Sequence, residues 1–130
     1  MLTTRRARNL LAGLRGTFGT MALVAPRPVG RAFGIDADAQ PAAVHLTRLL
    51  GVRDVLLCHQ LVSARDDDEA EEALRGGICV DAVDTVSALL GLATGDLSRR
   101  TSLMGAAAAA GAAALGLAAR GPLDAEAAGG

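Results

Sequence analysis

The chain has 130 residues, enough for one domain, and 51% of it is hydrophobic while 21% is charged. The net charge of −1 excludes a disordered, highly charged chain. Without a basic excess, and with only 2% aromatic residues, nucleic acid is not expected as a partner. Ala and Gly dominate instead, with 28 and 16 copies. Because small residues let helices approach closely in lipid, the composition favours a membrane helix bundle.

The first half of the chain contains two predicted helices. The first covers about 8–25 and ends before Pro26-Arg27-Pro28. Residues 4–8, TRRAR, resemble a twin-arginine export signal, but Arg15 interrupts the apolar stretch that follows and no clean cleavage site ends it, so we expect the helix to be retained. The second helix covers about 41–64 and starts at a proline, which suits the first turn of a helix.

The second half contains two more predicted helices. The third covers about 77–94 and follows the acidic run 66–72, which is interpreted as a solvated loop or the start of the helix. The fourth covers about 98–120 and stops at Gly121-Pro122. No segment alternates with period two, so no strand is expected, and 123–130 is predicted to be a flexible tail.

The lengths of these helices, 18, 24, 18 and 23 residues, fit a bilayer, which needs about 20 residues per span. The sequence therefore predicts an all-α, four-helix transmembrane bundle over residues 1–122. Only the fourth helix has a long uncharged run, 101–119. The other helices carry charges that each cost roughly 2.5–3.5 kcal/mol at a helix centre, so the bundle has to shield them.

The distribution of arginines predicts the orientation. One side of the predicted bundle has six: Arg5, Arg6, Arg8, Arg65, Arg75 and Arg120. The other side has four: Arg27, Arg31, Arg99 and Arg100. Because cytoplasmic loops are enriched in basic residues, we expect a multi-pass protein of the cell membrane with both termini in the cytoplasm.

Charges of opposite sign are balanced within the predicted helices. The predicted polar network consists of Arg15, Arg48, Arg53, Asp54, Asp81 and Asp84. Equal numbers of Arg and Asp permit ion pairs in the bundle interior. The network is interpreted in one of three ways: as a structural pairing that fixes helix register, as a functional centre, or as the surface charges of a soluble helical domain.

Helical geometry assigns these charges to faces, at about 100° per residue. On the first helix, the shared face is Arg8, Arg15, Gly19 and Ala22. On the second, the predicted inward face is His45, Arg48, Val52, His59 and Ser63. On the third, it is Asp81, Asp84, Thr85, Ala88 and Leu92. Arg53 lies to one side of the second helix's face, and Asp54 nearly opposite it.

The functional reading assigns proton transfer to these groups. Asp81 or Asp84, with Arg53 or His59 nearby, would line a polar cavity in which a buried carboxylate donates or accepts a proton. These four residues are the catalytic candidates, although no nucleophile motif supports them.

No metal and no cofactor are expected. His45 and His59 are fourteen residues apart, roughly 21 Å along a helix, so they cannot share one ion. Cys58, His59 and Cys79 supply at most three ligands without a recognisable motif. The thiols are interpreted as small hydrophobic groups, and a disulfide between them requires that the second and third helices bring them together.

Several short patterns resemble a known group of proteins. They are Leu50-Gly51-Val52-Arg53-Asp54, Val80-Asp81-Ala82-Val83-Asp84 and the Ala/Gly/Leu-rich fourth helix, over roughly residues 8–120. The chain is similar in these features to small actinobacterial four-helix membrane proteins of unknown function, which loosely resemble the DoxX-like group. The resemblance implies an integral membrane protein with buried Arg and Asp, and it brings no established activity. The absence of Trp and Tyr departs from that pattern.

Four functions follow from these patterns. The first is a structural or accessory membrane protein that forms a homo-oligomer or belongs to a larger membrane assembly. The second is a membrane-embedded enzyme or binding protein that acts on an apolar small molecule through Asp81 and Asp84. The third is a small proton-coupled transporter, although the first helix lacks a carboxylate. The fourth is a soluble helical domain.

Overall fold

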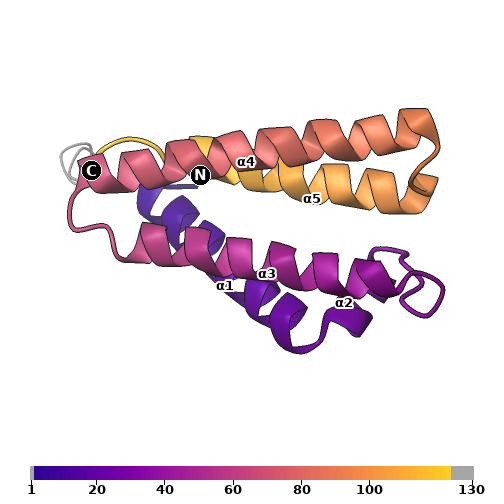
Figure 1. Ribbon diagram of the computed structural model, residues 1–130. Helices are drawn as coiled ribbons and strands as arrows, with labels where there is room; N and C mark the ends of the chain where they lie inside the picture. The colour runs from indigo at the N-terminus through magenta and orange to yellow at the C-terminus, as the bar shows by residue number, and fades with distance from the viewer. Residues whose placement is uncertain (1, 124–130) are drawn as a thin grey trace.

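The computed structural model describes residues 2–123, and over this range the chain is helical with no strand (Figure 1). The all-α prediction is confirmed. The helices are α1 (Thr4–Val24), α2 (Pro26–Ala32), α3 (Pro41–Val62), α4 (Asp67–Thr94) and α5 (Arg99–Ala118). The predicted tail 123–130 lies outside the described residues apart from Leu123.

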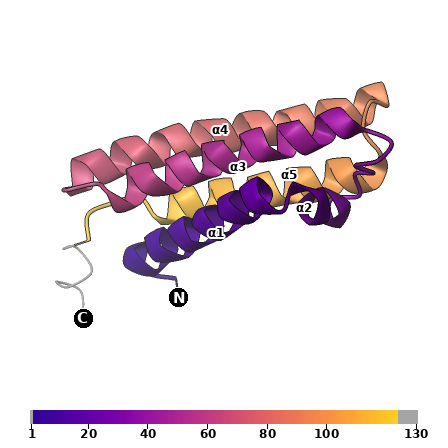
Figure 2. The same cartoon turned by 60° about the horizontal axis from the view of Figure 1, so that its bottom comes forward.

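The four long helices run up and down in two pairs. α1 packs against α3 and α4 packs against α5, with fewer contacts between the pairs. Figures 1 and 2 show the chain reversing after each long helix, so that the start of α1 and the end of α5 lie at one end of the bundle. The α3–α4 connection lies at that end, and α2 and the α4–α5 turn lie at the other.

The helix ends follow local sequence signals. Thr3, Asp66 and Ser98 each accept a hydrogen bond from the backbone N–H three residues later, which caps α1, α4 and α5. Gly95 adopts a φ of 79° directly after α4, a conformation that glycine reaches without strain. The predicted end of the third helix at Thr94 therefore agrees with the structure.

Several boundaries differ from the sequence prediction. α1 begins at Thr4 rather than at about residue 8, and α3 and α5 end two residues before their predicted ends. Pro26-Arg27-Pro28 ends α1 but also begins the short helix α2, because proline is compatible with the first turn of a new helix. α4 begins at Asp67, ten residues before the predicted Gly77. Its first turn contains Asp67, Asp68 and Glu69. Their negative charges stabilise the helix start by interacting with the positive end of the helix dipole, so the acidic run is helical.

Glycines set the spacing of the α1–α3 pair. A Cβ atom on Gly19 would lie 2.8 Å from the carbonyl oxygen of Gly51, and one on Gly51 would lie 2.7 Å from the carbonyl oxygen of Gly19. Gly116 plays a similar part between α5 and α4, where a Cβ would lie 2.7 Å from Ile78. Close backbone approach through small residues is typical of helix packing in membranes.

The bundle buries several polar and charged side chains beside a small apolar core of Ala7, Leu11, Leu74 and Ala119. Its buried residues include Arg15, Thr47, Asp54, Asp81 and Ser102. The large apolar side chains of the long helices are exposed instead, among them Leu14, Met21, Leu49, Leu50, Leu56, Val83, Val86, Leu90, Leu103 and Leu117. By length and composition, α4 and α5 are each capable of crossing a membrane.

Candidate functional site

A cavity of about 790 Å³ lies between the helix pairs. Small and apolar side chains of α1, α4 and α5 form most of its wall, including Leu14, Ala88, Gly105 and Ala108. Phe18 and Phe33 also line it, with ring centroids 6.0 Å apart and planes at 69°. These are the only two residues of the chain that are Phe, Tyr or Trp, so all of its large aromatic surface lies at the cavity.

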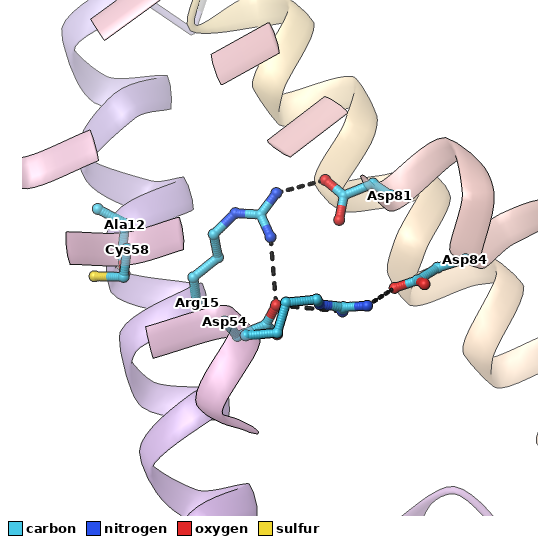
Figure 3. Close-up of polar contacts among 7 residues, drawn as sticks. Ala12, Arg15, Asp54, Cys58, Asp81 and Asp84 are labelled. Carbon is cyan, nitrogen blue, oxygen red and sulfur yellow. Dashed lines mark hydrogen bonds and ion pairs between the residues drawn. The ribbon is translucent and has the colours of Figure 1, made fainter. Parts of the chain in front are cut away.

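A chain of ion pairs forms the polar part of the cavity wall. The two η nitrogens of Arg15 contact Asp81 at 2.5 Å and Asp54 at 3.5 Å. Arg53 contacts Asp54 at 3.4 Å and Asp84 at 2.6 Å. Figure 3 shows the guanidinium of Arg15, from α1, directed between the carboxylates of Asp54 and Asp81. The network therefore links α1, α3 and α4.

Burial decreases along this network. Arg15 is 5% exposed, and both aspartates that it contacts are buried. The side chains of Arg53 and Asp84 are about one third exposed, at 30% and 32%. Removing one charge from the buried part would leave its partner desolvated without compensation.

The sequence around Arg15 makes room for it. Gly77 of α4 faces the guanidinium, and a Cβ atom at Gly77 would lie 3.0 Å from an η nitrogen of Arg15. The close α1–α3 crossing at Gly19 and Gly51 brings Arg15 and Asp54 within reach of each other. Glycines on three helices thus place one buried cation.

The structure brings together five of the six residues in the predicted network. Arg48 is the exception: it is exposed and forms no ion pair with any residue in 2–123. His59 lies apart from the other catalytic candidates as well, because it is exposed and its ring contacts only the hydroxyl of Ser63, at 3.2 Å. Proton exchange between His59 and Asp81 or Asp84 is therefore not supported by their positions.

The predicted inward face of the second helix is wrong. Its members, His45, Arg48, Val52, His59 and Ser63, are all exposed. The buried residues of α3 are Thr47, Gly51 and Asp54. Asp54, placed nearly opposite the inward face by the sequence prediction, is at the centre of the network. The spacing of Thr47, Gly51 and Asp54 at positions i, i+4 and i+7 was the signal for this small and polar buried face.

The two thiols lie outside the network. Cys58 donates a hydrogen bond to the carbonyl oxygen of Ala12 at 3.2 Å, and Cys79 is exposed. Both cysteines are free. Across the described range 2–123, no three His, Cys, Asp or Glu side chains gather closely enough to hold a metal ion.

Comparison with protein families, with curated proteins and with solved structures finds no match for this chain. What the protein binds or does is therefore inferred from the geometry of the site alone. An apolar cavity with a charged wall is suited to binding an amphipathic small molecule, because the apolar surface supplies affinity and the few polar groups supply orientation.

Proposed function

We propose that this chain is an integral membrane protein in which four long helices span the bilayer, and that the cavity between the helix pairs binds an apolar small molecule. The observation that carries the proposal is an uncharged outer belt around a charged interior. In a bilayer this distribution places apolar side chains against lipid and ionised groups against one another.

The belt is continuous over the four long helices. The exposed residues within 9–24, 49–64, 76–94 and 101–119 include no Arg, Asp or Glu. Each stretch has 16–19 residues, or about 24–28 Å of helix, which is close to the thickness of the hydrocarbon core.

The contacts between helices align the limits of the belt. Arg15 meets Asp81, and Gly116 meets Ile78, so the stretches of α1, α4 and α5 start and end at similar levels. By length and composition, α1 and α3 are not among the helices capable of crossing a membrane, but the charges within their stretches, Arg15, Arg53 and Asp54, belong to the internal network. The alignment supports α1 as a span beside α4 and α5, and the uncharged exposed face of 49–64 supports α3.

The even number of spans would place both termini on one side. With the exposed Arg48 counted at the far end, the arginine counts of the two ends are six against five, a small excess that favours the cytoplasm for the side of the termini. The predicted orientation and the resemblance to actinobacterial four-helix membrane proteins stay predictions.

Alkaline-carbonate washing of membranes from cells expressing the tagged chain tests the membrane part of the proposal. We expect the protein in the pellet, as for an integral protein, and solubilisation only with detergent. Recovery in the supernatant would make the chain a soluble helical domain and overturn the proposal.

Native mass spectrometry of the detergent-purified protein tests the cavity. We expect a bound small molecule that is lost in Ala108→Phe, because Ala108 lines the cavity and a benzyl group there reduces its volume. Ala110→Phe is the matched control, since Ala110 is exposed on the same helix but outside the cavity lining. Equal occupancy in both variants, or none in the parent, would contradict cavity binding.

A structural or accessory role is the second candidate, favoured by the burial of Arg15 between two aspartates. On this reading, Asp81→Asn would lower stability and helix assembly. On the binding reading, Asp84→Asn, at the exposed end of the network, would change ligand occupancy in a folded bundle. Size-exclusion profiles in mild detergent, measured beside occupancy, distinguish these two outcomes.

A further inference from the structure

The cavity wall carries an excess of negative charge. Within residues 2–123, the charged side chains that line it are two arginines and three aspartates: Arg15, Arg53, Asp54, Asp81 and Asp84. With all five ionised, one negative charge remains uncompensated. The ion pairs and hydrogen bonds to each of these aspartates engage one of its two oxygens, so acceptor capacity remains.

Asp84 is the end of the network that faces the cavity. It is the most exposed of the three carboxylates and pairs only with Arg53, whereas Asp54 contacts two guanidinium groups. The excess charge is therefore best neutralised from the cavity side, next to Asp84.

Aromatic side chains supply a second attraction for positive charge. Phe18 and Phe33 lie against the same cavity in an edge-to-face pair. The face of an aromatic ring attracts a cation through its quadrupole, and quaternary cations with little hydration benefit most. A carboxylate, two rings and an apolar wall within one cavity match the chemistry of a hydrophobic cation.

We propose that the cavity selects apolar molecules that carry a single positive charge, with Asp84 as the counter-ion and Phe18 and Phe33 as the aromatic wall. This inference rests on the proposed cavity binding and names its ligand class. The volume of about 790 Å³ falls within the range of small-molecule sites, roughly 300–1,000 Å³.

A pair of ions with the same shape and opposite charge provides the test. Tetraphenylphosphonium and tetraphenylborate are both apolar and differ in sign. We would titrate each into the full chain in nanodiscs of neutral lipid, with empty nanodiscs to correct for partition into lipid. We expect saturable binding of the phosphonium, at least about tenfold tighter than that of the borate.

Variants locate the source of the selectivity. Asp84→Asn is expected to reduce the preference for the cation by about tenfold. Phe18→Leu is expected to weaken the cation by about two- to fivefold and leave the borate unchanged. Asp68→Asn is the control, because it removes the same charge from an exposed residue in the first turn of α4. Circular dichroism confirms that each variant is folded.

The outcomes separate this inference from the proposed function. Binding of both ions with equal affinity, abolished by Ala108→Phe, would retain the cavity and overturn cation selection, as expected if a proton already neutralises one aspartate. Absence of saturable binding for both ions would overturn cation selection and would also contradict the binding of apolar molecules of this kind in the cavity. An equal effect of Asp68→Asn and Asp84→Asn would attribute the selectivity to net charge alone and also overturn it.

Discussion

At the residue scale, Arg15 has the strongest structural role. Its guanidinium is buried, contacts carboxylates of α3 and α4, and lies against Gly77. Charged side chains are almost never fully buried unless they are paired. Both partners of Arg15, Asp54 and Asp81, are buried too, so the three groups depend on one another.

Replacing Arg15 by Ala is expected to destabilise the bundle by about 3–5 kcal/mol, because two carboxylates are left buried with less compensation. Unfolding in mixed micelles with increasing denaturing detergent measures this change. Arg31→Ala, at an exposed position in α2, serves as the reference variant and should stay close to the parent.

Neutralising the partners should reverse much of that loss. In Arg15→Met with Asp54→Asn and Asp81→Asn, no buried charge remains in this part of the network, and stability should recover relative to Arg15→Ala. If Arg15→Ala were as stable as the parent, the ion pairs of Arg15 would contribute nothing to the stability of the fold.

At the scale of helices, glycine spacing decides which helices pair. Gly19 and Gly51 let the α1 and α3 backbones meet, and Gly116 admits Ile78 between α5 and α4. Other glycines have no such contact: a Cβ atom on Gly13 or Gly111 would meet nothing within 4 Å. The same residue type therefore has opposite effects on stability at different positions of one bundle.

Gly51→Ala is expected to destabilise the protein by about 1–3 kcal/mol, because the added methyl group overlaps the Gly19 carbonyl oxygen and forces α1 and α3 apart. Gly111→Ala should instead be neutral or stabilising by up to about 1 kcal/mol, since alanine is the better helix former. Thermal unfolding of both variants in the same detergent checks the prediction. Equal effects of the two substitutions would contradict the close contact.

At the scale of the whole molecule, the main feature is that paired charges are buried while many large apolar side chains are exposed. Val83 and Val86 of α4 are 63% and 56% exposed, whereas Asp81 on the same helix is 3% exposed. Beyond the uncharged belt, at the end of the bundle where α1 begins, a charged residue of α1 contacts the start of α4 and the residue that follows α5. Arg8 pairs with Asp67 at 2.8 Å and donates to the carbonyl oxygen of Ala119 at 3.0 Å.

Cysteine labelling tests this arrangement in membranes. In a background in which Cys58 and Cys79 are replaced by alanine, Val86→Cys should be protected from a charged maleimide, because the proposed membrane arrangement places this exposed part of α4 against lipid. Asp96→Cys, in the turn after α4, should react. Membrane fragments that are open on both sides give the reagent access to either face, so the result does not depend on the orientation of the protein. As a control, both variants should react after full denaturation. Rapid labelling of Val86→Cys in intact fragments would place the exposed valine in water.

The sequence by itself determined the helical fold, most of the helix ends and the charges that have to be buried. These features depend on local signals: the caps at Asp66 and Ser98, the turn at Gly95, and the cost of placing Arg or Asp in an apolar helix.

Only the tertiary structure decided which side of α3 faces inward. Polarity alone favoured the face with His45, Arg48 and His59, but the close approach of α1 required Gly51 at the contact, and Gly51 carries Asp54 inward with it. The same contact left Arg48 and His59 outside. The cavity and the excess of one carboxylate in its wall are likewise consequences of how the two helix pairs meet, because they depend on distances between helices that no local pattern encodes.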